Sequence, residues 1–518
     1  MGIKRFFATA DNTITNAYKP DLVTRATGSN MGASDVLEVF SIYAQVSSSS
    51  GLSSEESRVL INFDITGSTS GSVKSTRTSG DIPASGSVTF YLKLYNAAHG
   101  QTLPIDYSIE AAAVTKSWDE GYGLDMDEYK DPATGSGGAG SCWTKAGGAG
   151  DWKTEGGDIT TTPAYQYSQS VGLYGAVDLK LDVTSVVEAW INGESLLKGT
   201  NGFCVRVYPS SSALERSFYT KKFFGRESEF FFKRPVLEAR WDSAIKDDTG
   251  AFYLSSSLAP AADNLNTLYM YNYIKGKKTN IPDVGAGPNW IMLSIYSGSV
   301  DNSKPTGSKL QLPIAQPNGG VKAAHHTAIT GGYVSAGVYS ASFAFNSSSV
   351  TTIFPLWWTA SSDQSTVTEY HTASAVEVKT FISQDSDSYP IYVTKVTNLL
   401  AAYESNEKPR FRIHTRLKNW SPTIYNVASK ASENIIIEDA YYKIIRIADD
   451  LEVISYGTGS GDESYTHMSY DKSGNYFDLD MSMLDQDFTY GIKVAYKFDE
   501  KFSEQKELFK FRIERTMD

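Results

Sequence analysis

The clearest secondary-structure signal in the chain is the stretch Arg410-Phe411-Arg412-Ile413-His414-Thr415-Arg416-Leu417. Its apolar residues and Thr415 occupy every second position, and the charged residues occupy most of the positions between them. Since successive side chains of a strand point to opposite faces, this alternation predicts a strand with one buried face and one solvated face. Residues Phe509 to Glu514 repeat the pattern, so we expect the C-terminal residues to form a paired strand.

Further strand-like stretches recur along the whole sequence. The clearest are Val59–Ile65, Val88–Tyr95, Thr267–Tyr273, Trp290–Tyr296, Gly337–Phe345 and Ile391–Val393. The composition agrees with them, because 32 Tyr and 42 Gly among 518 residues suit many short strands joined by turns. We therefore predict an all-β chain.

One segment has the period of a helix instead. Val183, Val186, Val187, Trp190 and Ile191 follow the spacing i, i+3, i+4, i+7 and i+8. Asp182 is placed to cap the start of this helix, and Gly193 is placed to end it. The pattern predicts one short amphipathic helix inserted against a β core.

The length of the chain and its polar joints predict three domains. The strand pattern stops after Trp241 and gives way to the turn-rich stretch 242–250, and a second polar stretch covers 383–388. We expect domains at 1–242, 243–385 and 386–518. The spacing of strands in the second and third domains is typical of immunoglobulin-like β-sandwiches.

Charge and hydropathy exclude several classes of protein. The net charge of -12 is spread over the chain without a long basic tract, and the run Lys275-Gly276-Lys277-Lys278 is expected to be a solvated turn. No apolar stretch has the length of a membrane span, and the first residues lack the apolar segment of a signal peptide. We expect a chain that folds in a cytoplasm, binds no nucleic acid and does not insert into a membrane.

The motifs of common enzymes are absent or incomplete. Gly135 to Gly140 match G-x-G-x-x-G inside a Gly-rich loop that no buried strand precedes, and the acidic cluster between Asp119 and Asp131 lacks the spacing of a calcium loop. Cys142 and Cys204 have no metal-type spacing, and we expect two free, packed thiols rather than a disulfide. We therefore predict no catalytic residue, no metal and no cofactor, and a chain that is not an enzyme.

A Gly-rich loop with two tryptophans is the most suggestive candidate for a binding site. Trp143 and Trp152 lie in it, with Tyr122 and Tyr129 nearby in the sequence. Aromatic faces in a polar loop can stack on sugar rings or anchor a protein interface, but we favour local core packing over either use. If the loop binds a ligand, Tyr122, Trp143 and Trp152 are the candidate ligand-binding residues.

The two ends of the chain are candidates for assembly contacts. We expect the N-terminal segment around Ile3, Phe6 and Phe7, or the C-terminal strand around Phe509 and Phe511, to dock on another subunit. Packing within the same chain is the alternative.

The first domain contains several spaced motifs, which are Asp11–Thr15, Asn30–Val39, Arg58–Asp64, Trp118–Gly121, Asp182–Thr184 with Trp190, Phe224–Glu227 and Arg234–Leu237. In their order and spacing these motifs resemble DNRLRE-type domains. The resemblance covers residues 6–242 and implies a jelly-roll sandwich related to carbohydrate-binding modules, which by itself does not imply sugar binding.

The segment 224–248 and the two C-terminal domains resemble structural proteins of marine T4-like tailed bacteriophages. This resemblance implies a virion component, such as a neck, tail, baseplate, fibre or decoration protein, that is assembled in the host cytoplasm. Its partners would be other virion proteins, copies of itself and a host-surface polysaccharide. The alternatives are a polysaccharide-binding adhesin and a polysaccharide-degrading enzyme with an accessory binding module.

Overall fold

The structure is a computed structural model. It describes residues 2–48, 51–67, 71–100, 107–124, 140–172, 175–207, 218–256, 264–282, 284, 291–315, 321–360, 367–380, 391–421, 423–424, 434–458, 464–498 and 501–515. Strands make up 46% and helices 8% of the chain, which confirms the prediction of an all-β protein.

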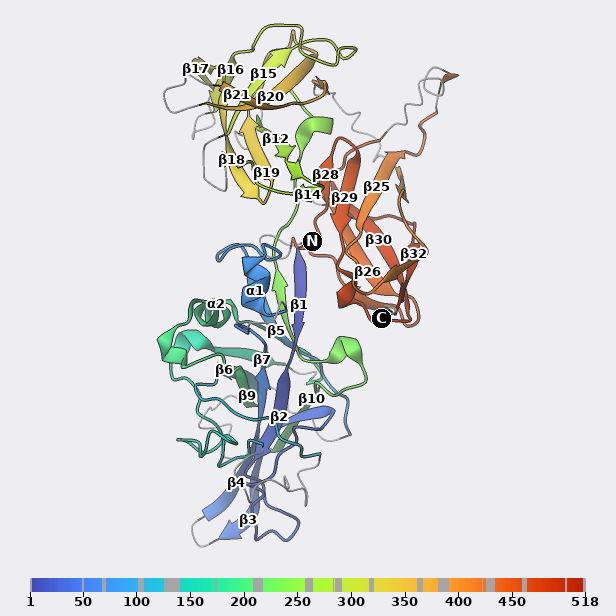
Figure 1. Ribbon diagram of the computed structural model, residues 1–518. Coiled ribbons are helices and arrows are strands. Elements are labelled where there is room, and N and C mark those ends of the chain that lie inside the picture. The colour runs from blue at the N-terminus through green and yellow to red at the C-terminus, as the bar shows by residue number, and fades with distance from the viewer. Residues whose placement is uncertain are drawn as a thin grey trace. The chain divides into compact units, whose positions relative to one another are not determined.

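The chain divides into two compact units (Figure 1). The N-terminal unit comprises residues 2–242 with 459–465, and the C-terminal unit comprises 243–458 with 466–518. The expected joint near residue 385 lies outside the described residues, so the division into three domains stays a prediction.

The N-terminal unit is a sandwich of two sheets. The four-stranded sheet has the order β1 (Ile3–Phe7), β11 (Val236–Arg240), β5 (Thr89–Leu94) and β8 (Leu179–Asp182). The seven-stranded sheet has the order β10 (Phe218–Phe224), β3 (Val36–Ser48), β4 (Gly51–Asn62), β9 (Phe203–Val207), β6 (Tyr107–Ala113) and β7 (Gln166–Val171), and β2 (Ala10–Thr15) pairs with β4. All of these described pairs are antiparallel.

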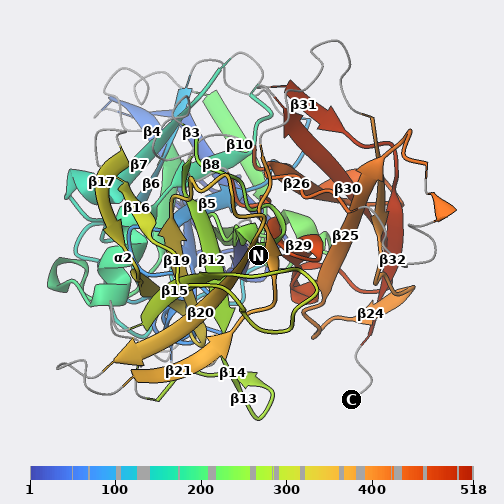
Figure 2. The same cartoon turned by 90° about the horizontal axis from the view of Figure 1, so that it is seen from above.

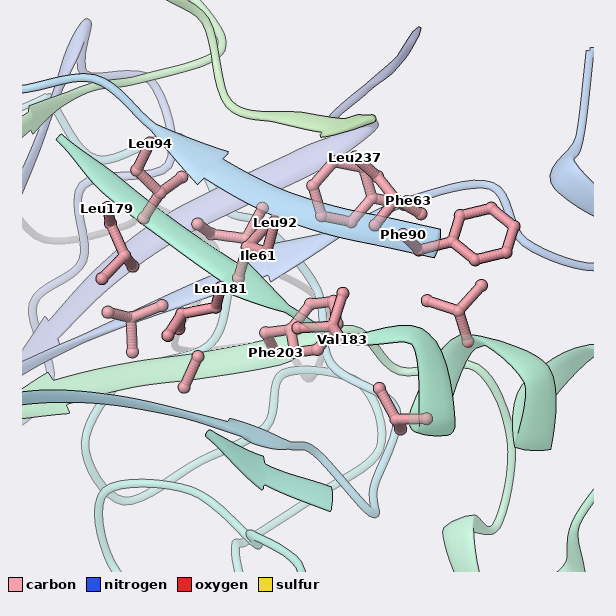
Figure 3. Close-up of a cluster of buried hydrophobic side chains, with 14 of the residues drawn as sticks. Ile61, Phe63, Phe90, Leu92, Leu94, Leu179, Leu181, Val183, Phe203 and Leu237 are labelled. Carbon is pink, nitrogen blue, oxygen red and sulfur yellow. The ribbon is translucent and has the colours of Figure 1, made fainter. Parts of the chain in front are cut away.

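The core of this sandwich is formed by the inward positions of both sheets (Figure 3). Phe90, Leu92 and Leu94 alternate along β5 and are fully buried, as the period of the stretch 88–95 predicts. Leu179 and Leu181 of β8 and Phe203 of β9 belong to the same cluster.

The predicted helix is α2 (Thr184–Asn192), and it covers one end of this core. Its side chains Val186, Val187, Trp190 and Ile191 are buried, and the Trp190 ring meets Phe203 edge-on at 5.1 Å. Gly193 ends the helix with φ 73°, as expected. The N-cap residue is Val183 and not the predicted Asp182, whose carboxylate lies one residue earlier and accepts a hydrogen bond from the Thr184 N–H at 3.0 Å. A second helix, α1 (Val73–Thr78), was not predicted, because its six residues are too few to show a period.

The C-terminal unit begins with a seven-stranded antiparallel sheet. Its order is β12 (Asn266–Tyr271), β19 (Val338–Phe343), β18 (Ile329–Ser335), β15 (Ile291–Ser297), β20 (Thr352–Ala360) and β21 (Val367–Thr372), and β22 (Val376–Glu377) pairs with β20. Two hairpins accompany it, β13 (Tyr273–Ile274) with β14 (Lys277–Lys278) and β16 (Leu312–Ala315) with β17 (Val321–His326). Lys277 and Lys278 are exposed in their hairpin.

The strands of the last two sheets of this unit are drawn in orange and red in Figure 2. One has the order β23 (Tyr392–Val396), β25 (Arg410–Leu417), β29 (Gly474–Asp478) and β28 (Ser469–Asp471). The other has the order β24 (Ala402–Glu404), β32 (Phe509–Glu514), β30 (Thr489–Phe498), β26 (Ala440–Arg446) and β27 (Leu451–Ile454), and β31 (Lys501–Glu504) pairs with β30.

Strand β25 has the bounds and the faces that the sequence predicts. Phe411, Ile413 and Thr415 are buried, and Thr415 Oγ1 lies 2.8 Å from the hydroxyl of Tyr496 in the other sheet. The C-terminal strand β32 pairs with β30 and, in parallel, with β24, which confirms that these residues form a paired strand.

Candidate functional site

Three sequence motifs that are about a hundred residues apart meet in the N-terminal unit. They contribute Asp11 on β2, Glu120 and Arg226. The Glu120 carboxylate accepts two hydrogen bonds from the Arg226 guanidinium, at 3.1 and 3.0 Å, and a third from the Asp11 N–H at 2.8 Å. In return, the Arg226 N–H donates to Asp11 Oδ2 at 2.6 Å. The paired fork of a guanidinium and a carboxylate fixes both side chains.

Asn30 holds the residues that follow Glu120. Its Oδ1 accepts a hydrogen bond from the Gly123 N–H at 2.7 Å, and the Ala33 N–H donates to the Gly123 carbonyl at 2.9 Å. A Cβ on Gly123 would lie 1.9 Å from the Asn30 carbonyl oxygen, and one on Gly121 would lie 2.6 Å from Asn30 Nδ2. Glycine is therefore required at both positions, because the two backbones approach so closely.

Asp119 holds the same segment at its other end. Its backbone N–H donates to the Ala146 carbonyl at 3.0 Å, its carbonyl accepts from the Ser141 N–H at 2.7 Å, and its Oδ2 accepts from the Gly148 N–H at 2.5 Å. We name residues 119–123 the clamped segment, since hydrogen bonds fix it from one end to the other.

Two apolar side chains project from this part of the chain. Tyr122 is 67% exposed within the clamped segment, and Leu124, directly after it, is 60% exposed. Glu227 and Arg226 form an ion pair at 2.7 Å and are partly exposed as well. The structure thus presents an aromatic side chain on a hydrogen-bonded backbone, an aliphatic side chain directly after it, and a charged pair at Arg226, which binds Glu120 of the same segment.

Asp11 is the one member of this network with an unsatisfied oxygen. It is fully buried, and within the described residues its Oδ1 has no hydrogen-bond partner. Burial, assisted by the charge of Glu120, raises the pKa of Asp11 to about 7, although the Arg226 N–H and its charge oppose this shift.

The two tryptophans of the candidate binding site are core residues, as the favoured interpretation of local core packing predicts, and they form no exposed stacking surface. Trp143 is 5% and Trp152 is 6% exposed, in a cluster with Ile14, Leu60, Val114, Ala146 and Cys204. The Arg58 guanidinium lies 4.9 Å from the Trp143 ring centre, and Trp152 Nε1 donates to the Cys142 carbonyl at 2.8 Å. Both rings therefore pack in a small core and are not free to stack on a ligand. Tyr129 lies outside the described residues.

The expected assembly residues are also largely covered by their own chain. Ile3 is 1% exposed, Phe6 is 8% exposed and Phe511 is 1% exposed, because β1 and β32 are paired strands whose inward side chains join the interior. Only Phe7 and Phe509 are half-buried, and the Phe7 ring lies 4.9 Å from that of Phe231. Ile3, Phe6 and Phe511 are thus interior residues of their own chain, which corrects the prediction that their side chains dock on another subunit.

A hollow of about 290 Å³ lies elsewhere on the N-terminal unit. It is lined by Thr15, Ala17, Tyr18, Lys19, Pro20, Leu22, Ala26 and Gln45. The Arg25 guanidinium lies 4.3 Å from the centre of the Tyr18 ring and already covers one aromatic face. This hollow is therefore a weaker platform for stacking than the exposed Tyr122.

The described parts of the chain contain both cysteines and a number of possible metal ligands. They contain no group of three or more His, Cys, Asp or Glu side chains placed to hold a metal ion. Cys142 and Cys204 are both buried and free, which confirms the expected pair of packed thiols. The rest of the acidic cluster, from Asp125 to Asp131, and most of the stretch 135–140 lie outside the described residues.

The fold places the chain among all-β proteins built from β-sandwiches. No protein-family model and no curated protein matches it. Among solved structures, the N-terminal Ig1-2 module of the Drosophila receptor protein tyrosine phosphatase DLAR covers 48% of this chain and 91% of its own length, with 6% identity and a TM-score of 0.13. The tandem Ig repeats of Dlar cover 51% and 93%, again with 6% identity and a TM-score of 0.13. No helix in the described residues is both long enough and apolar enough to cross a membrane.

Proposed function

We propose that this chain is a non-enzymatic structural component of a bacteriophage virion and that it acts through protein–protein assembly. The observation that carries the proposal is the presentation of Tyr122 and Leu124, 67% and 60% exposed, on or directly after a backbone that hydrogen bonds hold in place. Ordering an interface loop on binding costs conformational entropy, and a segment already fixed avoids that cost.

The chemistry of these side chains favours a protein partner. Tyrosine is enriched among the residues that dominate binding energy, and a neighbouring leucine adds apolar area that a sugar ring matches poorly. The charged pair of Arg226 and Glu227 supplies the polar rim that surrounds such an anchor in protein interfaces.

The virion setting rests on the resemblance of the C-terminal part of the chain to structural proteins of tailed phages. Other virion proteins and further copies of the chain are the proposed partners, and contact with a surface polysaccharide is a secondary role. A polysaccharide-binding adhesin is the main rival, since the motifs of the N-terminal unit resemble carbohydrate-binding modules.

The double variant Tyr122→Ala with Leu124→Ala tests the proposed anchor. Phage that encode it should carry at least about tenfold less of the chain per particle, because the loss of one interface anchor costs about 2 kcal/mol or more. Tyr273→Ala is the matched control, since Tyr273 is also exposed, at 56%, but lies in the hairpin of the C-terminal unit. Equal incorporation of the double variant and the control would show that Tyr122 and Leu124 are not an interface anchor.

A further inference from the structure

Lys221 is a buried lysine of the N-terminal unit that lacks an acidic partner at ion-pair distance in the described residues. It lies on β10 and is 1% exposed. Its Nζ donates to Asn96 Oδ1 and, at 2.8 Å, to the Gly175 carbonyl. Two neutral acceptors leave a buried ammonium poorly compensated, so burial shifts the amine towards its neutral form.

Asn96 is held in place beside this amine. It follows β5, its backbone N–H donates to Asp178 Oδ1 at 2.8 Å, and it forms an antiparallel bridge with Phe223. The Phe223 ring centre lies 5.4 Å from Lys221 Nζ and forms an apolar wall of the site. A primary amine, a carboxamide and a carboxylate are thus gathered at one point from three distant parts of the chain.

We propose that Lys221 and Asn96 form a covalent amide cross-link within the chain. The lone pair of Lys221 Nζ attacks Cγ of Asn96, the bond from Cγ to Nδ2 breaks, and ammonia leaves with that electron pair. One proton passes from the amine to the departing nitrogen, so the step needs no oxidant, reductant or cofactor. Asp178 is a positioning residue, because it fixes the backbone of Asn96.

The environment of the amine supports this step. Burial lowers the pKa of Lys221 to about 8, and the charge of Asp178 opposes the shift only in part. About half of the amine is then neutral at pH 8, against about one part in 250 for an ordinary lysine. A neutral amine in contact with the group it attacks reacts as an intramolecular nucleophile, for which effective concentrations are very high.

The cross-link would give the sandwich a covalent tie that its two free cysteines do not supply. It would join β10 at the edge of the seven-stranded sheet to the segment that follows β5 in the four-stranded sheet, across 125 residues of sequence. Such a tie goes beyond the proposed assembly role, and it restricts the unfolding of the sandwich as a disulfide does.

The intact mass of the full chain, measured under denaturing conditions after incubation at pH 8, tests the proposal. We expect the wild type to be lighter than its sequence by one ammonia molecule, and peptides that contain residues 96 and 221 to be joined. Lys221→Arg and Asn96→Ala should each have their full calculated mass. The control Lys222→Arg should keep the deficit, since Lys222 pairs instead with Glu38 at 3.6 Å.

Two results would overturn the cross-link. One is a wild-type chain at its full calculated mass. The other is a deficit that persists in Lys221→Arg, because succinimide formation at an Asn-Gly pair such as Asn201-Gly202 also releases ammonia. The wild-type mass and its joined peptides decide the question even if a variant fails to fold.

Discussion

At the scale of single residues, Asp11 links local chemistry to the stability of the clamped segment. Its carboxyl group is fully buried, with Glu120, Arg226 and Glu227 as the charged groups that act on it. Since its pKa is raised to about 7 in the folded state, the folded chain binds a proton that the unfolded chain has already lost. The contribution of Asp11 is therefore largest below about pH 4 and is lost as the pH rises through 7.

Asp11→Asn should remove this pH dependence. An amide cannot ionise, so this position no longer makes the free energy of unfolding fall as the pH rises. The difference in free energy of unfolding, variant minus wild type, should therefore increase by up to about 1.4 kcal/mol per pH unit between about pH 4 and 7. Denaturant titrations of both proteins across this range measure the difference. A difference that stays constant with pH would contradict the raised pKa.

The tryptophans mark the limit of what could be predicted residue by residue. Trp143 and Trp152 lie in a polar, Gly-rich stretch that resembles an exposed loop, and nothing local shows that Leu60 and Cys204 complete a small core around them. Burial of this kind depends on residues far away in the sequence. Tyr122 could be found from its type and setting, whereas the exposure of Leu124 and the burial of Lys221 could not.

At the scale of elements, strand β11 is tied to its neighbours by a buried carboxylate. Glu238 is fully buried and contacts Arg5 of β1 at 2.7 Å, Lys93 of β5 at 3.5 Å and Arg240 at 2.7 Å. Burial alone would raise the pKa of Glu238, but these three cations hold it well below its usual range. Its contribution to stability is therefore present above about pH 4.5 and is lost as the pH falls towards the folded pKa.

Glu238→Gln should destabilise the N-terminal unit by about 3–5 kcal/mol at pH 7, because it leaves buried cations without their anion. The control Glu452→Gln, at a side chain that is 52% exposed and pairs with Lys443, should cost less than about 1 kcal/mol. Equilibrium unfolding in urea compares the two variants. Similar losses in both would show that burial does not govern the strength of the Glu238 cluster.

The end of helix α2 gives a test of backbone conformation alone. Gly193 has φ 73°, and a Cβ placed there would meet no atom within 4 Å. Gly193→Ala should therefore cost about 1 kcal/mol through backbone strain, while Gly193→Asn should cost less, since asparagine tolerates the left-handed region. Thermal unfolding of the three proteins measures both costs, and an alanine variant as stable as the wild type would contradict this account.

Elements with a strong period were predictable because their signal is local. Strand β25, strand β5 and helix α2 each bury the side chains that their spacing selects. Helix α1 was missed because six residues are too short to show a period, and the meeting of Glu120 with Arg226 was missed because no local pattern encodes a contact across 106 residues.

At the scale of the whole molecule, the chain forms two compact β units, and the N-terminal unit exposes the proposed anchor of Tyr122 and Leu124. Such a molecule suits assembly, because rigid sheets hold an interface in place without a loop that must be ordered on contact. The proposed tie between Lys221 and Asn96 would add resistance to unfolding within the N-terminal unit.

The most direct test of the central proposal is quantitative mass spectrometry of gradient-purified phage particles from a host culture that produces the chain. We predict that the chain is present in a fixed ratio to the other structural proteins and that the ratio survives repeated purification. A chain that stays in the soluble lysate and is absent from purified particles would contradict the proposal.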